Sequence, residues 1–153
     1  MGVHNNQGRI EKVVELKATV PRVWRAITDI EEFGAWFRVR LDNAFEVGAT
    51  TTGTMTSPGH ESVKWVSTTE AMEHERLFAF SWPPGAVDPD TAYSDDAKVR
   101  VEFRLEATDT GTRLTITETG FVQFPEAKRL EVLRSNEQGW AIQAENITAH
   151  VAG

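Results

Sequence analysis

The order of its hydrophobic patterns constrains the fold of this chain most strongly. Two short helical segments near the N-terminus precede a long run of strand-like sequence, and one amphipathic helix closes the chain. The clearest strand signal lies in residues 97–107, where Val99, Val101, Phe103 and Leu105 alternate with charged side chains. Such alternation is typical of a strand with one face in the core and the other in water. The order predicts an α+β fold in which a curved antiparallel sheet packs on one long helix.

The remaining segments follow the same two periods. Residues 9–20 alternate, and Thr19 and Pro21 then mark the start of a helix, with Asp29 placed to cap a second short helix over residues 30–36. Further strands are expected within residues 43–57, on both sides of a turn at residues 47–49. Others are expected over 62–72, over 76–82, and on both sides of a hairpin turn at 109–111. Between them, residues 83–96 form a long acidic loop, and loops of this length are usually functional or mobile.

The final helix should begin at Pro125 and pack one face on the sheet. Its apolar residues recur at steps of three and four, and Glu137 stands in the gap of this series, which consists of Ala127, Leu130, Leu133, Trp140, Ala144, Ile147 and Val151. A carboxylate in an apolar series is unexpected, because burying an isolated charge is costly.

Composition limits the classes of function. The 153 residues suit one domain over 9–153, preceded by a flexible polar tail over 1–8. A formal net charge of -7 disfavours nucleic acid and anionic membranes as partners, because phosphate binding needs clustered Lys and Arg. The absence of cysteine excludes disulfides and thiolate chemistry. No apolar run approaches the roughly 20 residues of a membrane span, so a cytoplasmic location is expected.

The chain resembles the START-like, or SRPBCC, superfamily, and within it the branch of the C-terminal domain of the heat-shock-protein-90 ATPase activator. The segments that carry the resemblance are residues 18–28, the aromatic pair Trp36-Phe37, residues 75–82, residues 111–121 and Gly139-Trp140. The resemblance covers residues 9–152 and implies a helix-grip fold, with two short helices after the first strand. It also implies space for a ligand between the sheet and the long helix.

The expected ligand site is therefore a cavity between sheet and helix, with a volume of at least about 300 Å³. Aromatic side chains would supply apolar contacts, or would simply fill the core, and Glu118 and Glu137 would be polar anchors. The full set of predicted ligand-binding residues is Trp36, Phe37, Trp65, Phe78, Phe80, Trp82, Phe103, Glu118, Glu137 and Trp140. If the two acids approach closely, one pKa should rise. Arg76 could instead pair with either acid in a structural ion pair.

No catalytic motif, phosphate-binding glycine loop or metal-ligand spacing occurs, and no cofactor is expected. Three functions stay open. The first is binding of a small apolar or aromatic molecule by a monomer or homodimer. The second is interaction with a protein partner of chaperone type. The third is a polyketide cyclase or aromatase-like reaction that uses one carboxylate of the cavity, with Glu118 as the acid or base.

Overall fold

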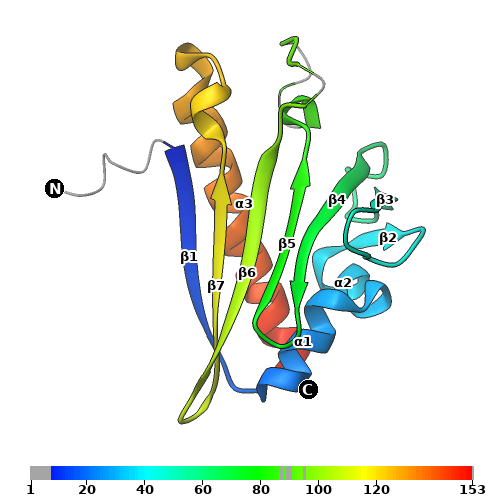
Figure 1. Ribbon diagram of the computed structural model, residues 1–153, viewed down its shortest axis with the longest axis vertical. Helices are drawn as coiled ribbons and strands as arrows, with labels where there is room; N and C mark the ends of the chain where they lie inside the picture. Colours follow the sequence, from blue (N-terminus) through cyan, green and yellow to red (C-terminus); the bar gives the residue numbers. More distant parts are fainter. Residues whose placement is uncertain (1–7, 87, 89–90, 95, 153) are drawn as a thin grey trace, which may run out of the picture.

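The structure is a computed structural model that describes residues 8–86, 88, 91–94 and 96–152. Its elements follow the predicted order, from the first strand through two short helices and a sheet to one long helix (Figure 1). The strands are β1 (Arg9–Leu16), β2 (Val39–Leu41), β3 (Thr50–Met55), β4 (Lys64–Glu73), β5 (Leu77–Trp82), β6 (Val99–Thr108) and β7 (Gly111–Thr119). The helices are α1 (Val20–Thr28), α2 (Ile30–Phe37) and α3 (Glu126–Ala152), with short 3-10 turns η2 (Pro84–Ala86) and η3 (Phe121–Gln123).

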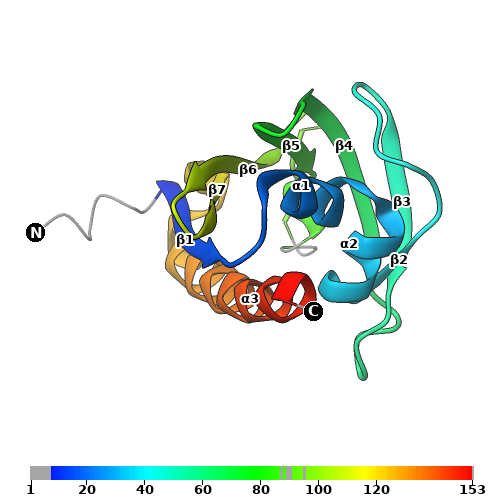
Figure 2. The ribbon, with the colours of Figure 1, turned by 90° about the horizontal axis from the view of Figure 1, so that it is seen from below.

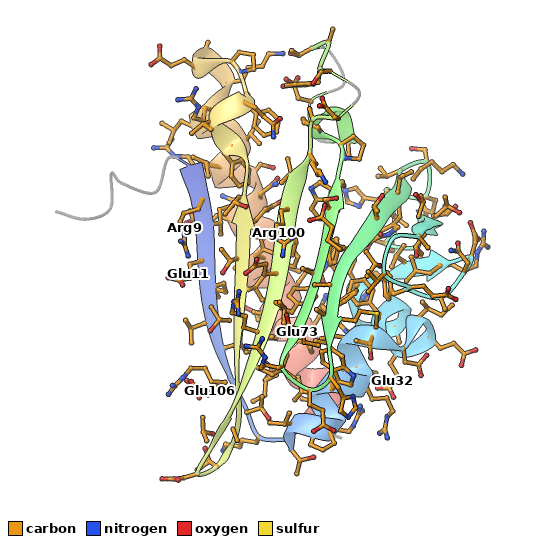
Figure 3. All side chains as sticks on the ribbon, viewed as in Figure 1. Arg9, Glu11, Glu32, Glu73, Arg100 and Glu106 are labelled. Carbon is orange, nitrogen blue, oxygen red and sulfur yellow. The ribbon has the colours of Figure 1, made fainter. Side chains whose placement is uncertain are left out.

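One antiparallel sheet holds all seven strands in the order β1-β7-β6-β5-β4-β3-β2. Seen from below, the sheet curves around α1 and α2, and α3 lies across its open side (Figure 2). The opposite face of the sheet is charged, and Arg9, Glu11, Arg100 and Glu106 project from it (Figure 3). The predicted α+β helix-grip fold is therefore confirmed.

Local signals in the sequence account for the two short helices. The side chain of Thr19 accepts a hydrogen bond from the backbone N–H of Arg22 and caps α1, and Pro21 lies in the first turn. The side chain of Asp29 caps α2 in the same way through the N–H of Glu31. Both predicted caps are confirmed. Arg38 then adopts a left-handed conformation with φ of 71°, which ends α2 and directs the chain into β2.

Several strand boundaries differ from the prediction. The strand expected over residues 9–20 ends at Leu16, and the strand expected from residue 43 lies earlier, at Val39–Leu41. A register shift between Thr69 and Ala71 interrupts the pairing of β4 with β5, so a strict two-residue period does not hold along β4. In β5 the side chains on both faces are buried from Leu77 to Ser81, so burial along this strand does not alternate as it does in a strand with one face in water.

Aromatic side chains fill the space between the sheet and the helices. Phe33 of α2 is fully buried at the centre, where it stacks on Phe37 at a centroid distance of 5.0 Å. Its ring also meets Trp36, Phe45 and Trp65 edge to face at 4.9 to 5.6 Å. Offset and edge-on aromatic contacts of this kind add stabilisation beyond the area they bury. This packing fixes α2 against the sheet.

The acidic loop between β5 and β6 is attached to the long helix. The hydroxyl of Tyr93 donates to Oδ2 of Asp88 at 2.6 Å, and Nζ of Lys128 on α3 donates to Oδ1 at 3.0 Å. Lys128 also donates to the hydroxyl of Thr91 at 3.0 Å. Residues 87, 89–90 and 95 of this loop, like residues 1–7 of the predicted tail, lie outside the described residues.

An ionic cluster holds the three helices together at the other end of the molecule. Arg22 and Arg25 of α1 donate to the two carboxylate oxygens of Glu32 on α2 at 2.6 and 2.7 Å. His150 of α3 lies 3.0 Å from the same side chain. Burial of Glu32 opposes its ionisation, but the hydrogen bonds from His150, Arg22 and Arg25 outweigh burial and lower its pKa to about 2.

Glu32→Gln should therefore destabilise the fold at neutral pH. A carboxyl with a lowered pKa in the folded state stabilises the fold above its unfolded pKa of about 4.5, and this contribution is lost as the pH falls towards 2. We expect a loss of about 1–3 kcal/mol at pH 7, which shrinks below pH 4.5. Urea unfolding between pH 2.5 and 7 measures the difference.

Glu31→Gln is the matched control, because Glu31 lies in the same first turn of α2 and is exposed. It should change the free energy of unfolding by no more than about 0.5 kcal/mol at any pH. Equal effects of the two substitutions would show that helix-dipole interactions, rather than the cluster, dominate.

Candidate functional site

A fully buried carboxylate lies on the inner face of the sheet. Strand alternation turns Leu114, Ile116 and Glu118 of β7 inward, and the side chain of Glu118 is 0% exposed. Its partner across the pair with β1 is Ile10, and its partner on β6 is Val101. Because both of these strand partners are apolar, neither gives the carboxylate a side-chain donor, and its hydrogen bonds come from another element.

Two residues of α3 provide those hydrogen bonds. The indole Nε1 of Trp140 donates to Oε1 of Glu118 at 2.8 Å. The amide Nδ2 of Asn136 lies 3.2 Å from Oε1 and 3.3 Å from Oε2. Since the two donors are four residues apart, they lie on one face of the helix, one turn from each other. The long helix is thus hydrogen-bonded to β7, the strand next to the edge strand β1, through the carboxylate of Glu118.

The pKa of Glu118 reflects two opposing effects. Burial raises the pKa above its ordinary value of 4.5, because a charged carboxylate is poorly solvated there. Hydrogen bonds from Trp140 and Asn136, and the nearby indole of Trp82, favour the charged form, but they only partly offset burial. Glu118 therefore keeps its proton to a higher pH than an ordinary glutamate does.

Trp82, the last residue of β5, leaves a donor unused. Its indole Nε1 is buried and has no hydrogen-bond partner within the described part of the chain. The N–H lies near enough to Glu118 to favour its ionised form, but its geometry falls outside the limits of a hydrogen bond. A buried donor without a partner costs about 1–3 kcal/mol, so its presence needs an explanation.

A pocket of about 250 Å³ opens to solvent at this point. Its lining comes from the ends of α2, β3, β5 and β7 and from one face of α3, and consists of Phe37, Met55, Trp82, Glu118, Ser135, Asn136, Gly139, Trp140 and Gln143. The lining is mainly apolar, and Glu118 contributes its floor. Gln143 donates from Nε2 to the carbonyl oxygen of Phe37 at 3.1 Å and so fixes one side of the opening.

The pocket is smaller and shallower than the sequence predicted. Its volume lies just below the lower end of about 300 Å³ that is usual for ligand sites. A hollow of about 400 Å³ lies on the outer face of the sheet near Thr50, Thr68 and Lys98, but none of the described residues that line it is a buried ionisable group. The interior between sheet and helix is filled by the aromatic core instead of enclosing a large cavity.

The predicted site residues divide into three groups. Four of them line the pocket, namely Phe37, Trp82, Glu118 and Trp140. Five others are packed in the aromatic core away from its lining, namely Trp36, Trp65, Phe78, Phe80 and Phe103. Glu137 is exposed, so the expectation that it faces Glu118 across a cavity is wrong. Arg76 pairs with neither acid and forms an ion pair with Glu73.

Asn136 occupies the place expected for Glu137. In the apolar series of α3 the gap lies between Leu133 and Trp140, and both positions 136 and 137 fit a step of three or four. The spacing alone does not distinguish the carboxylate at 137 from the amide at 136. Sequence reasoning also missed Met55, Ser135, Gly139 and Gln143 as lining residues, since none of them interrupts a pattern.

Metal binding finds no support in this part of the molecule. Among the described residues, no three His, Asp or Glu side chains gather as they would around a metal ion.

The described helices also include none that is long and apolar enough to cross a membrane.

Solved structures share this fold at low sequence identity. A protein from Mesorhizobium loti is 19% identical with a TM-score of 0.72, and the alignment covers 94% of this chain and 96% of that one. A protein from Nitrosomonas europaea is 16% identical with a TM-score of 0.74, with 95% of both chains covered. DynU16, a putative protein in the dynemicin biosynthetic locus, is 17% identical with a TM-score of 0.70. That match covers 95% of this chain and 47% of DynU16.

Among curated protein sequences, none matches this chain significantly. The sequence model of the family described as Activator of Hsp90 ATPase homolog 1-like protein matches residues 17–152, which is nearly the whole chain. The seven-stranded sheet and the long C-terminal helix agree with the helix-grip fold of that family. The chain therefore belongs to the family of Activator of Hsp90 ATPase homolog 1-like proteins.

Proposed function

We propose that this protein binds a small apolar or aromatic molecule in the pocket above Glu118. The observation that carries the proposal is a buried carboxylate that lines a mainly apolar pocket, beside an indole N–H that has no hydrogen-bond partner in the part of the chain that the structure describes. Pockets of this composition bind ligands through apolar contact and use a few polar groups for orientation. At about 250 Å³ the pocket suits a compound smaller than an ordinary drug-sized ligand.

Gly139 supports the proposal because it keeps the mouth of the pocket open. It lies in the interior of α3, where glycine costs about 1 kcal/mol relative to alanine. A Cβ at this position would meet no atom within 4 Å, so packing does not require glycine here. The residue does line the pocket, and any side chain would take space from a ligand.

A cyclase-like reaction is the second candidate, and the raised pKa of Glu118 favours it. A carboxyl that holds its proton to higher pH can act as a general acid towards a bound carbonyl or enol. The similarity to DynU16 is a likeness of fold, and it brings in no substrate. A protein partner of chaperone type stays a prediction from the family resemblance.

Native mass spectrometry of freshly purified protein tests the binding proposal directly. The expected spectrum contains a second species heavier than the chain by the mass of one small molecule, which disappears under denaturing conditions. Extraction and identification of that molecule would define the ligand. Should the protein carry no small molecule and bind none from a library of small aromatic compounds, the proposal fails.

Gly139→Leu should abolish binding without harming the fold. The leucine side chain would enter the pocket, and leucine is a better helix former than glycine, so the free energy of unfolding should stay equal or rise by up to about 1 kcal/mol. The measurement is ligand retention in native mass spectrometry together with urea unfolding.

Gln138→Leu is the matched control for this substitution. Gln138 precedes Gly139 on the same helix, is exposed, and does not line the pocket. It should leave ligand retention unchanged. If both variants retain the ligand equally, the bound molecule occupies another place.

Glu118→Gln should raise the free energy of unfolding at neutral pH and weaken the binding of the proposed ligand. The pKa of this carboxyl is higher in the folded state than its unfolded value of 4.5. Its ionisation therefore does not lower the free energy of unfolding below pH 4.5, and lowers it progressively as the pH rises through the folded pKa. Glutamine removes this penalty, so the advantage of the variant should grow from pH 4.5 upwards and exceed about 0.5 kcal/mol at pH 8.

Glu137→Gln, which changes an exposed carboxyl on α3, serves as the control for charge. Its effect on the free energy of unfolding should stay within about 0.5 kcal/mol across the same pH range. A Glu118→Gln variant that is less stable than the wild type at pH 8 would show that the buried carboxylate contributes net stability. That result would remove the argument that Glu118 is retained for binding.

A further inference from the structure

We propose that the ligand of this pocket is a neutral molecule whose hydroxyl group lies between Trp82 and Glu118. The proposal rests on the proposed function and goes further, because it names the polar group of the ligand. In the bound state the ligand hydroxyl accepts a hydrogen bond from the indole Nε1 of Trp82 and donates one to the carboxyl group of Glu118.

The first support is the unequal use of the two carboxylate oxygens. Oε1 of Glu118 accepts a hydrogen bond of 2.8 Å from Trp140 and lies 3.2 Å from Nδ2 of Asn136. Oε2 has only the 3.3 Å contact with the same amide nitrogen. Because each carboxylate oxygen can accept two hydrogen bonds, Oε2 retains capacity for another donor. The indole N–H of Trp82 lies near Glu118 but outside hydrogen-bond geometry, and Glu118 borders the pocket, so a ligand there is the remaining source of that donor.

The second support is Trp82. Its Nε1 is buried and has no hydrogen-bond partner among the described residues, it lines the same pocket, and an indole N–H can only donate. A ligand that satisfies both side chains must present an acceptor to Trp82 and a donor to Glu118. A hydroxyl group does both with one oxygen atom, which suits a pocket of about 250 Å³.

Other simple groups satisfy only part of the site. An ether or ketone accepts from Trp82 but carries no donor, so it can pair with Glu118 only while that carboxyl keeps its proton. An ammonium group pairs with Glu118 but faces the indole N–H with a second donor. A carboxylate places a second negative charge beside Glu118, where neighbouring like charges disfavour ionisation. The hydroxyl also pairs with Glu118 in either protonation state, because it can donate or accept.

Four size-matched probes test the inference by isothermal titration calorimetry on the full chain at pH 7. They are p-cresol, p-xylene, 4-methylanisole and 4-methylbenzylammonium. The hydroxyl of p-cresol replaces one methyl group of p-xylene, and 4-methylanisole keeps the oxygen as an acceptor but removes the donor. We expect p-cresol to bind at least about tenfold more tightly than each of the other three.

Two variants connect that preference to the named side chains. Trp82→Phe removes the indole N–H, and Glu118→Gln removes the carboxylate while keeping its shape. Each should reduce the preference for p-cresol over p-xylene to about threefold or less, because a charged partner or one of two hydrogen bonds is lost. Trp24→Phe and Glu137→Gln make the same chemical changes outside the pocket lining and should keep the preference of the wild type.

The outcomes separate this inference from the proposed function. If p-cresol and p-xylene bind with equal affinity, the hydroxyl inference is overturned and apolar binding stands. Tightest binding of 4-methylbenzylammonium overturns it in favour of a cationic ligand. If none of the four probes binds, there is no support for a small-molecule pocket, and the inference fails together with the proposed function. The comparison of probes uses the wild-type chain, so it remains decisive even where a variant does not fold.

Discussion

The buried carboxylate of Glu118 is the group on which the placement of α3 against the sheet depends most. Glu118 is fully buried and its direct partners on the neighbouring strands are apolar, and its hydrogen bonds come from the helix that covers it. Asn136 and Trp140 meet that need from adjacent turns of α3. The requirement fixes both the rotation of the helix about its axis and its position along β7. Apolar packing alone would specify these less strictly, because it is not directional.

The same constraint explains why the pocket lies where it does. Aromatic rings around Phe33 fill the interior on the α2 side, so little free space remains there. Near Glu118 the helix presents an amide and an indole, which satisfy the carboxylate, and a glycine, which leaves space in the adjoining pocket. Trp82 also lines the pocket, with an N–H for which residues 8–86, 88, 91–94 and 96–152 provide no hydrogen-bond partner. A buried acid with a raised pKa and an unused donor both cost stability, and such costs are typical of functional sites.

Much of the fold could be predicted because strands and helices have different periods. The alternation of β6 and β7 and the three-to-four spacing of α3 correctly placed Phe103, Ile116 and Ile147 in the core. The cap residues Thr19 and Asp29 gave the starts of the short helices. The candidate site was harder to predict, since a lining residue such as Gly139 or Gln143 breaks no period. Such a residue lines the pocket only because the ends of other helices and strands pack beside it in the folded structure.

The sequence by itself determined the order of the elements, the one-sided sheet and the inward direction of Glu118, since each follows from a local period along the chain. Only the tertiary structure decided which helix residue meets that carboxylate. Positions 136 and 137 both fit the gap between Leu133 and Trp140, but successive helical residues point about 100° apart at 3.6 residues per turn. The packing of α3 across the curved sheet selects Asn136 and leaves Glu137 in solvent. Its rotation depends on contacts distant in sequence, which no local pattern records.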